Sequence, residues 1–170
     1  MIETKKLILR KYSEEDIPAL HQILSDPVTM SFWPKPFSIE QTAGWIERAM
    51  KSYNQNDFGR MGVILKETGE LIGDCGIIFG SDIDGKNEND LGYIIDNKFC
   101  RRGFGFEAAD AVQTYAFEKL NLSRLAAIMA FDNIASMRTA QKIGMQKEKE
   151  YYSKPNRNIL TYLFSSKRIS

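Results

Sequence analysis

Residues 91–105 read LGYIIDNKFCRRGFG, in which an apolar strand pattern runs into a glycine turn at the start of a long helix pattern. Backbone N–H groups at such a helix start lack intrahelical partners and can converge on an anion. Gly103 and Gly105 have no Cβ, so the backbone there can adopt unusual dihedral angles and approach a phosphate closely. Arg101 and Arg102 add positive potential beside them. The turn therefore predicts a pyrophosphate site, although a plain tight turn beside solvated arginines produces the same short pattern.

The patterns on either side of this turn predict a mixed α/β domain. Helical and strand-type apolar patterns follow one another in the order β-α-α-β-β-β-α-β-α-β-β. The polar stretch from Ser81 to Asn89 is expected to be an exposed loop, and Lys66–Glu70 is expected to close an antiparallel hairpin. The expected strands are Leu7–Lys11, Met61–Leu65, Leu71–Phe79, Leu91–Ile95 and Arg124–Ala130, followed by two strands around a turn at 154–156.

Capping residues mark where the helices begin and end. Ser13 precedes an acidic first turn, and Ser38 with Gln41 has the pattern of a capping box. The last helix is expected over Asn133–Ile143 and is ended by Gly144. Because no repeat, low-complexity segment or linker divides the chain, we expect one domain over residues 1–170.

The composition excludes several classes of protein. The 170 residues are 43% hydrophobic, which is enough for a core and excludes a disordered tail. The net charge of +1 argues against nucleic acid as the main partner. Cys75, Cys100 and a single histidine are too few for a disulfide scaffold or a zinc site, so no metal is expected. Without a signal core or a membrane-spanning run of roughly 20 apolar residues, we expect a soluble cytoplasmic protein.

Two well-known phosphate motifs do not fit the turn. A P-loop needs a Gly-Lys-Ser/Thr ending, and a dinucleotide fingerprint needs a third glycine, for which Ala108 is the nearest small residue. The hexapeptide CRRGFG at 100–105 instead resembles the Q/R-x-x-G-x-G/A signature of the GNAT acetyltransferase superfamily, whose turn binds the pyrophosphate of acetyl-CoA. Cys100 departs from the signature at a position that is expected to act through backbone and packing.

The resemblance extends over nearly the whole chain and points to the RimJ/RimL-like branch, which acetylates the amino termini of ribosomal proteins. Met145 departs from the usual phenylalanine, and Ala140 stands where other branches have a general-acid tyrosine, so a tyrosine acid is missing at this position. The matching segments are Leu7-Ile8-Leu9-Arg10, Asp16, Gly73, residues 91–95, the glycine turn with Phe106-Glu107-Ala108-Ala109, Asn133-x-x-Ser136 and Lys142-x-Gly144.

The resemblance implies both a fold and a cofactor site. The fold would be a single GNAT-type α/β (α+β) domain with a mixed, mostly antiparallel sheet of about seven strands and about four flanking helices. Acetyl-CoA would be the co-substrate, and its pantetheine arm would bind the backbone of Ile94 and Ile95 where their strand splays from its neighbour. Asn133 would also lie near the cofactor. The pyrophosphate would be held by Arg101, Arg102, Gly103, Phe104 and Gly105.

Acetyl transfer to an amine needs a neutral amine, a stabilised oxyanion and a proton or hydrogen bond for the departing thiolate. The resemblance implies that Ser136 lies near the CoA sulfur and donates to the thiolate; an ordinary first-turn serine, with Asn133 as the helix cap, explains the same pattern. Asp90 is the candidate base for the amine, and a solvated acidic loop is the alternative. Because an exposed aspartate has a pKa of about 3.9, this role needs a raised pKa or a water chain.

The predicted function is direct transfer of an acetyl group from acetyl-CoA to a primary amine, with a protein N-terminal amine as one candidate. Trp33 and Phe37, with Trp45, suit a wall of the acceptor cleft and equally suit a core. Cys100 beside two arginines would have a lowered pKa, but it has no evident partner base and is assigned no catalytic role. A homodimer is expected on symmetry grounds only. The alternative functions are an inactive or weakly active acyl-CoA sensor or scaffold and a module that binds nucleotide phosphates.

Overall fold

One eight-stranded sheet runs through the chain in the computed structural model, which describes residues 1–168. Its strand order is β1-β2-β3-β4-β5-β6-β8-β7, and every neighbouring pair is antiparallel except the parallel pair β5 and β6. This confirms the expected mixed sheet and order of elements, with a two-residue first strand added at one edge. The strands are β1 (Ile2–Glu3), β2 (Leu7–Arg10), β3 (Arg60–Leu65), β4 (Leu71–Ile83), β5 (Lys86–Ile95), β6 (Arg124–Ala130), β7 (Gln146–Ser153) and β8 (Ile159–Lys167).

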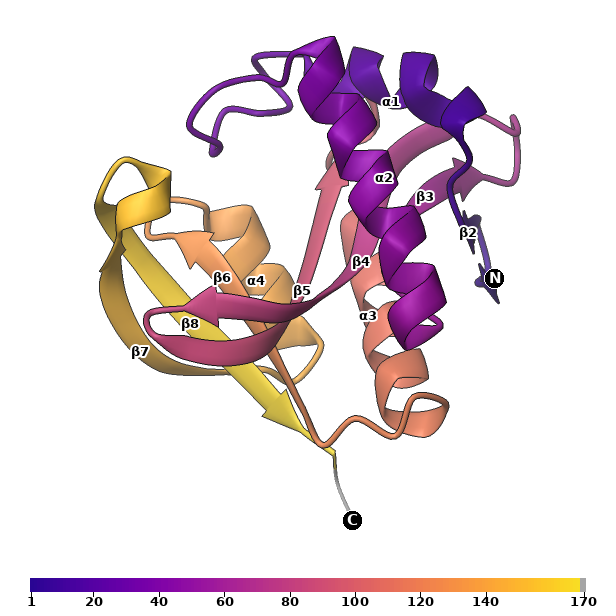
Figure 1. Cartoon of the computed structure of the whole chain (residues 1–170). Helices are drawn as coiled ribbons and strands as arrows, with labels where there is room; N and C mark the ends of the chain where they lie inside the picture. Colours follow the sequence, from indigo (N-terminus) through magenta and orange to yellow (C-terminus); the bar gives the residue numbers. More distant parts are fainter. Residues whose placement is uncertain (169–170) are drawn as a thin grey trace.

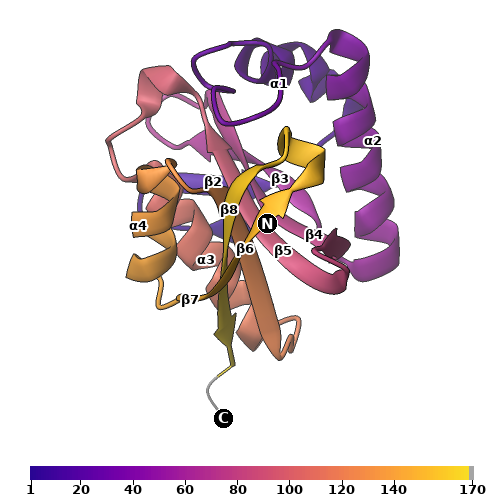
Figure 2. The same ribbon diagram turned by 90° about the vertical axis from the view of Figure 1, so that its left-hand side faces the viewer.

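Four α-helices cover the two faces of the sheet: α1 (Ile17–Leu24), α2 (Ile39–Asn56), α3 (Phe104–Glu118) and α4 (Ile134–Lys142). Helices α1 and α2 lie on one face, and α3 and α4 lie on the other, with the strands between them (Figure 1, Figure 2). Short 3₁₀ turns lie at Glu14–Asp16, Asn97–Phe99 and Lys154–Asn156. Within residues 1–168, no helix has both the length and the apolar character that crossing a membrane requires.

The alternation of side chains along β5 separates two hydrophobic clusters. Ile94 packs with α1 and α2 residues, whereas Leu91 and Ile95 pack in the cluster that contains α3. Successive side chains of a strand point to opposite faces, so residues 90, 92 and 94 face the same side as α1 and α2. Each fully buried leucine or isoleucine of these clusters contributes about 1.5–3 kcal/mol to stability.

The capping signals at the helix ends are confirmed. The hydroxyl of Ser38 accepts a hydrogen bond from Gln41 N–H at 3.2 Å, and Gln41 Oε1 accepts one from Ser38 N–H at 2.9 Å. Gly144 follows α4 with φ of 85°, the left-handed conformation that ends a helix most readily at glycine.

The segment 81–89 is a hairpin and not the exposed loop that its polarity predicts. Strand β4 continues to Ile83, and β5 begins at Lys86. The reason is that the outward positions of this arm are polar, while Ile83 points inward and is only 2% exposed against Ala126 and Leu163. A single inward apolar residue is too weak a pattern to identify a strand from sequence.

Most of the acidic charge on this hairpin is paired. Asp84 accepts from Lys149 Nζ at 2.5 Å, and Glu88 accepts from Arg124 Nε at 2.9 Å. Lys149 on β7 and Arg124 on β6 therefore neutralise these two carboxylates, and Asp90 is the acidic residue of this stretch that lines the central cleft.

Candidate active site

Strands β5 and β6 separate soon after they meet. Asp90 and Ala126 form the one register pair between them in the described part of the chain. Beyond this pair β5 stays hydrogen-bonded to β4 and β6 to β8, and the two strands diverge (Figure 1). Backbone groups on the inner sides of two diverging strands have no ladder partner, so they are free to bind something else.

The register decides which amides of β5 face this opening. Asp96 N–H donates to Ile72 O at 2.9 Å, and hydrogen-bonded pairs alternate with non-bonded pairs along an antiparallel ladder. The N–H of Ile94 therefore points to β4. The N–H groups of Tyr93 and Ile95 point the other way, toward the opening.

The glycine turn lies at the carboxyl end of β5. Arg101 and Gly103 both have positive φ, 63° and 83°, and Gly103 is the N-cap of α3. The first helical hydrogen bond runs from Glu107 N–H to Gly103 O at 3.0 Å. The N–H groups of residues 104–106 come before it and have no partner within the helix. Arg101 and Arg102 are exposed beside these amides. The turn thus combines free N–H groups and positive charge, which suits a phosphate.

Gly105 is required by a close contact with Tyr93. A Cβ on Gly105 would stand 2.6 Å from Cε2 of the Tyr93 ring. Phe104 is only 2% exposed, so a ligand at the turn meets its backbone and not its side chain. The absence of a side chain at Gly105 lets the Tyr93 ring lie against the start of α3, with its hydroxyl 3.5 Å from Ser136 Oγ.

The start of α4 brings two predicted residues to the opening. Asn133 Oδ1 accepts a hydrogen bond from Ser136 N–H at 3.1 Å, so Asn133 is the helix cap. The Ser136 hydroxyl faces the hydroxyl of Tyr93. The sequence did not identify the Tyr93 side chain as part of the site. Its distance from Ser136 depends on the packing of α3 and α4 and not on the spacing of residues along the chain.

A cleft of about 490 Å³ lies between the diverging strands and the loop before α2. Its lining includes the predicted residues Asp90, Asn133, Ser136, Trp33 and Phe37. The predicted cofactor residues Ile94, Ile95, Arg101, Arg102, Gly103, Phe104 and Gly105 lie outside that lining, on β5 and at its carboxyl end.

Three aromatic rings form one wall of the cleft. The ring centroids of Trp33 and Phe37 are 5.5 Å apart, and each of these rings is 5.8 Å from that of Trp45. All three pairs meet edge to face, the arrangement that aromatic quadrupoles favour. Trp33 and Phe37 are half-buried, so they belong both to the cluster under α1 and α2 and to the wall of the cleft.

Asp90 lies half-buried in the cleft, and burial raises its pKa to about 6, with the charge of Arg60 opposing the rise. Its strand partners Ile78 and Ala126 are apolar. The titratable groups near it are Arg60 on β3 and Tyr151 on β7, whose own pKa is raised by burial and by the charge of Asp90. An aspartate with this pKa is ionised at neutral pH and is a stronger base than an exposed one.

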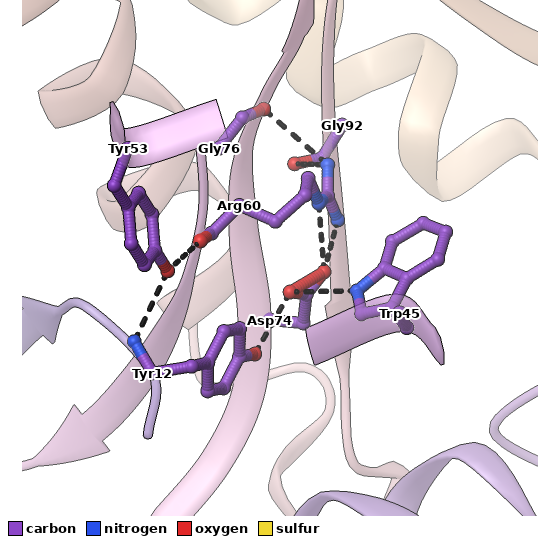
Figure 3. A network of polar contacts seen from close by, with 7 residues as sticks. All are labelled: Tyr12, Trp45, Tyr53, Arg60, Asp74, Gly76 and Gly92. Carbon is purple, nitrogen blue, oxygen red and sulfur yellow. Dashed lines mark hydrogen bonds and ion pairs between the residues drawn. The ribbon is translucent and has the colours of Figure 1, made fainter. Parts of the chain in front are cut away.

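A buried ion pair between Arg60 and Asp74 lies next to Trp45, one of the three rings of the aromatic wall (Figure 3). Asp74 is 0% exposed and accepts from Arg60 Nε at 2.8 Å, from the Tyr12 hydroxyl at 2.8 Å and from Trp45 Nε1 at 3.3 Å. Arg60 Nη1 donates to Gly92 O at 2.6 Å. No local motif marks Arg60 in the sequence, because its partners come from other strands and from the helix layer.

Neither cysteine has the properties of a nucleophile. Burial raises the pKa of Cys75 to about 12. Burial and the charge of Asp96 also raise the pKa of Cys100, so the lowering expected from its two neighbouring arginines is wrong. A thiol with a raised pKa carries little thiolate near neutral pH.

Comparisons with known proteins agree with this geometry. The family described as acetyltransferase (GNAT) domain matches residues 6–146. The chain is 32% identical over 167 residues to the uncharacterized N-acetyltransferase p20 of Bacillus licheniformis, a match that covers 95% of this chain and 93% of p20. The crystal structure of a GNAT-family acetyltransferase from Bacillus anthracis matches with a TM-score of 0.82, 27% identity and 98% of both chains covered.

A further solved structure shares the fold. RimL, a ribosomal L7/L12 alpha-N-protein acetyltransferase in complex with coenzyme A, matches with a TM-score of 0.78 and 18% identity, covering 96% of this chain and 95% of RimL. At that identity the likeness concerns the fold alone. The family match and the p20 relationship, which both cover most of the chain, establish that it belongs to the GNAT family of acetyltransferases.

Proposed function

We propose that this acetyltransferase moves an acetyl group directly from acetyl-CoA to a primary amine while both are bound. The observation that carries the proposal is the divergence of β5 and β6, which places unpaired amides between the glycine turn and Asp90. The pantetheine arm would lie along these amides, and the pyrophosphate would lie on residues 101–105. The shared fold of RimL, which was solved with coenzyme A, supports this placement.

The acetyl carbonyl would meet backbone donors on β5. The amides of Tyr93 and Ile95 point toward the opening, so they are the proposed partners of the thioester oxygen and the pantetheine arm. Ile94 turns its N–H to β4, so of the predicted pair Ile94 and Ile95 only Ile95 offers an N–H to the opening, and Tyr93 joins it. Fixed donors aimed at an oxygen that gains charge lower the barrier because they need no reorganisation during the reaction.

Residues of the cleft supply the proton acceptor and the hydrogen-bond donor that the transfer step needs. The amine nitrogen attacks the thioester carbon, the new C–N bond forms, and the C–S bond breaks as the oxyanion collapses. Asp90 accepts the proton that the amine loses, directly or through water. The departing thiolate accepts a hydrogen bond from the Ser136 hydroxyl, which lies 3.5 Å from the Tyr93 hydroxyl and can share the task with it, and the thiolate takes its proton from water.

The acceptor class follows from the aromatic wall and Asp90. The wall offers apolar surface and the carboxylate offers a negative charge, so the cleft suits an amine carried on a group with an apolar face. We propose a peptide N-terminal amine as the first candidate. The fold shared with ribosomal-protein acetyltransferases such as RimL, together with the motif pattern of the RimJ/RimL-like branch, supports this choice.

The experiment is a thiol-release screen of the purified chain with acetyl-CoA and a panel of peptides with different first residues, polyamines and small amines. We expect release with peptides that begin with a small or apolar residue, and mass spectrometry should find the acetyl group on the α-amine. The Asp90→Asn variant tests the proposed base in the same assay. Asp84→Asn, which removes a carboxylate at the far end of the hairpin, is its control. Tight acetyl-CoA binding without release on any amine would instead support the sensor or scaffold.

A further inference from the structure

Apart from the effect of the Arg60 charge on the pKa of Asp90, the Arg60 and Asp74 pair has no task in the mechanism above, although it is the most deeply buried ion pair in the described residues. Replacing a buried ion pair by apolar side chains is often neutral or stabilising, so stability alone is a weak explanation for one. The position of the pair offers another explanation. Arg60, Gly76 and Gly92 are register neighbours on β3, β4 and β5, in one row across the sheet.

The glycines of this row let the guanidinium lie flat across the strands. A Cβ on Gly92 would stand 2.8 Å from Arg60 Nη1, so a larger residue would push the side chain away. The fork of Arg60 divides its donors between two kinds of partner (Figure 3). Nε and Nη2 bond to Asp74, while Nη1 bonds to Gly92 O at 2.6 Å and to Gly76 O at 3.3 Å.

Gly92 O belongs to the same peptide unit as the N–H of Tyr93. A trans peptide is planar, and its C=O and N–H point in opposite directions. With Gly92 O held on the β4 side by Arg60, the Tyr93 N–H is directed into the opening between β5 and β6. A hydrogen bond from a cation polarises the peptide and makes its N–H a stronger donor.

We propose that Arg60 is a positioning residue for acetyl transfer, which acts by holding and polarising the peptide between Gly92 and Tyr93 so that its N–H stabilises the oxyanion. The inference rests on the proposed function. The bond to the thioester oxygen strengthens as that oxygen gains negative charge, so Arg60 acts on kcat and leaves CoA binding unchanged. Asp74 fixes the guanidinium through two bonds, and Tyr12 and Trp45 fix Asp74.

The test measures the carbonyl stretching frequency of ¹³C-labelled acetyl-CoA bound to the protein, by isotope-edited infrared spectroscopy, together with kcat and CoA affinity. Arg60→Met with Asp74→Met removes both charges and leaves neither one unpaired. We expect the carbonyl band to move toward its frequency in free acetyl-CoA, kcat to fall about tenfold, and CoA affinity to stay the same. The fall is smaller than the roughly 10²–10³-fold cost of deleting an oxyanion donor because the N–H remains.

Arg10→Met is the matched control, because Arg10 also binds an aspartate through two bonds, to Asp16 at 2.7 and 2.8 Å, and does not touch β5. It should leave the band and kcat unchanged. A wild-type band in the double variant would overturn the inference, whether or not kcat falls, since a purely structural role predicts that result.

Arg60→Lys decides the matter if the double variant does not fold. A lysine ammonium lacks the planar fork that serves Asp74 and Gly92 together, so we expect an intermediate band and a several-fold lower kcat. Wild-type values for both would overturn the inference. Failure of the proposed function gives a different result, because the wild-type chain would then bind CoA without releasing thiol on any amine, or would not bind CoA.

Discussion

The middle of strand β5 and its carboxyl end are built in different ways. At the carboxyl end, the turn at 101–105 takes its shape from its own backbone, with positive φ at Arg101 and Gly103. In the middle of the strand, the pKa of Asp90 depends on burial and on the charge of Arg60, which belongs to another strand. In the proposed mechanism, cofactor binding therefore depends on local chain geometry, whereas the chemistry depends on tertiary packing. Variants in these two regions should therefore fail in different steps.

The largest effect is expected for Asp90→Asn in the middle of β5. Loss of the base should lower kcat by about 10²–10⁴-fold and leave acetyl-CoA affinity unchanged. In the wild type, kcat/KM should fall as the pH drops through about 6, because the raised pKa means that the carboxylate is protonated below that value. The variant should lose this acidic limb, as measured by thiol release between pH 5 and 8. A retained limb would assign the proton transfer to another group.

Gly103→Glu should break the carboxyl end alone. The new side chain places negative charge against the pyrophosphate at a residue with φ of 83°, so acetyl-CoA affinity should fall by about 100-fold or more. Gly69→Glu is the matched control, since Gly69 has φ of 72° and open space around its Cβ position, and it lies in the hairpin turn between β3 and β4. Calorimetry measures the acetyl-CoA affinity of both variants. Equal affinities for the two variants would remove the turn from the cofactor site.

Ser136→Ala tests the step between these two regions, the departure of the thiolate in the cleft. One hydrogen bond to the departing thiolate contributes about 1 kcal/mol, so kcat should fall by about 3–10-fold with little change in the KM for acetyl-CoA. Tyr93→Phe should have a similar effect if the hydroxyls share the task, and Ser123→Ala, at an exposed site, should have none. Wild-type turnover in both Ser136→Ala and Tyr93→Phe would exclude the pair from the mechanism.

The smallest effect is expected for Trp33→Ala in the aromatic wall. Its loss removes apolar contact with the acceptor and leaves the base and the turn in place, so KM for apolar amines should rise about 3–10-fold at nearly constant kcat. Tyr152→Ala, which removes an aromatic residue that is 65% exposed on β7, should change neither KM nor kcat. Steady-state kinetics with one apolar and one polar acceptor would check this. Equal changes for both acceptors would contradict a role in acceptor recognition.

The same contrast explains how far the sequence could be interpreted. The glycine turn, the capping box at Ser38 and the order of elements follow from local patterns, and the structure confirms them. The hairpin over 81–89 could not be identified, because Ile83 is its single inward apolar residue. The Arg60 bond to Gly92 joins residues that only the pairing of β3, β4 and β5 brings together, so spacing along the chain carries no sign of it.

Direct transfer is the central claim, and a single-turnover experiment tests it most directly. The chain is mixed with one equivalent of acetyl-CoA, with or without the best acceptor from the amine panel, and each species is followed by mass spectrometry. We expect free CoA and acetylated acceptor to appear together, and we expect no acetyl group on the chain when the acceptor is omitted. Formation of an acetylated chain before the acceptor is added would contradict direct transfer.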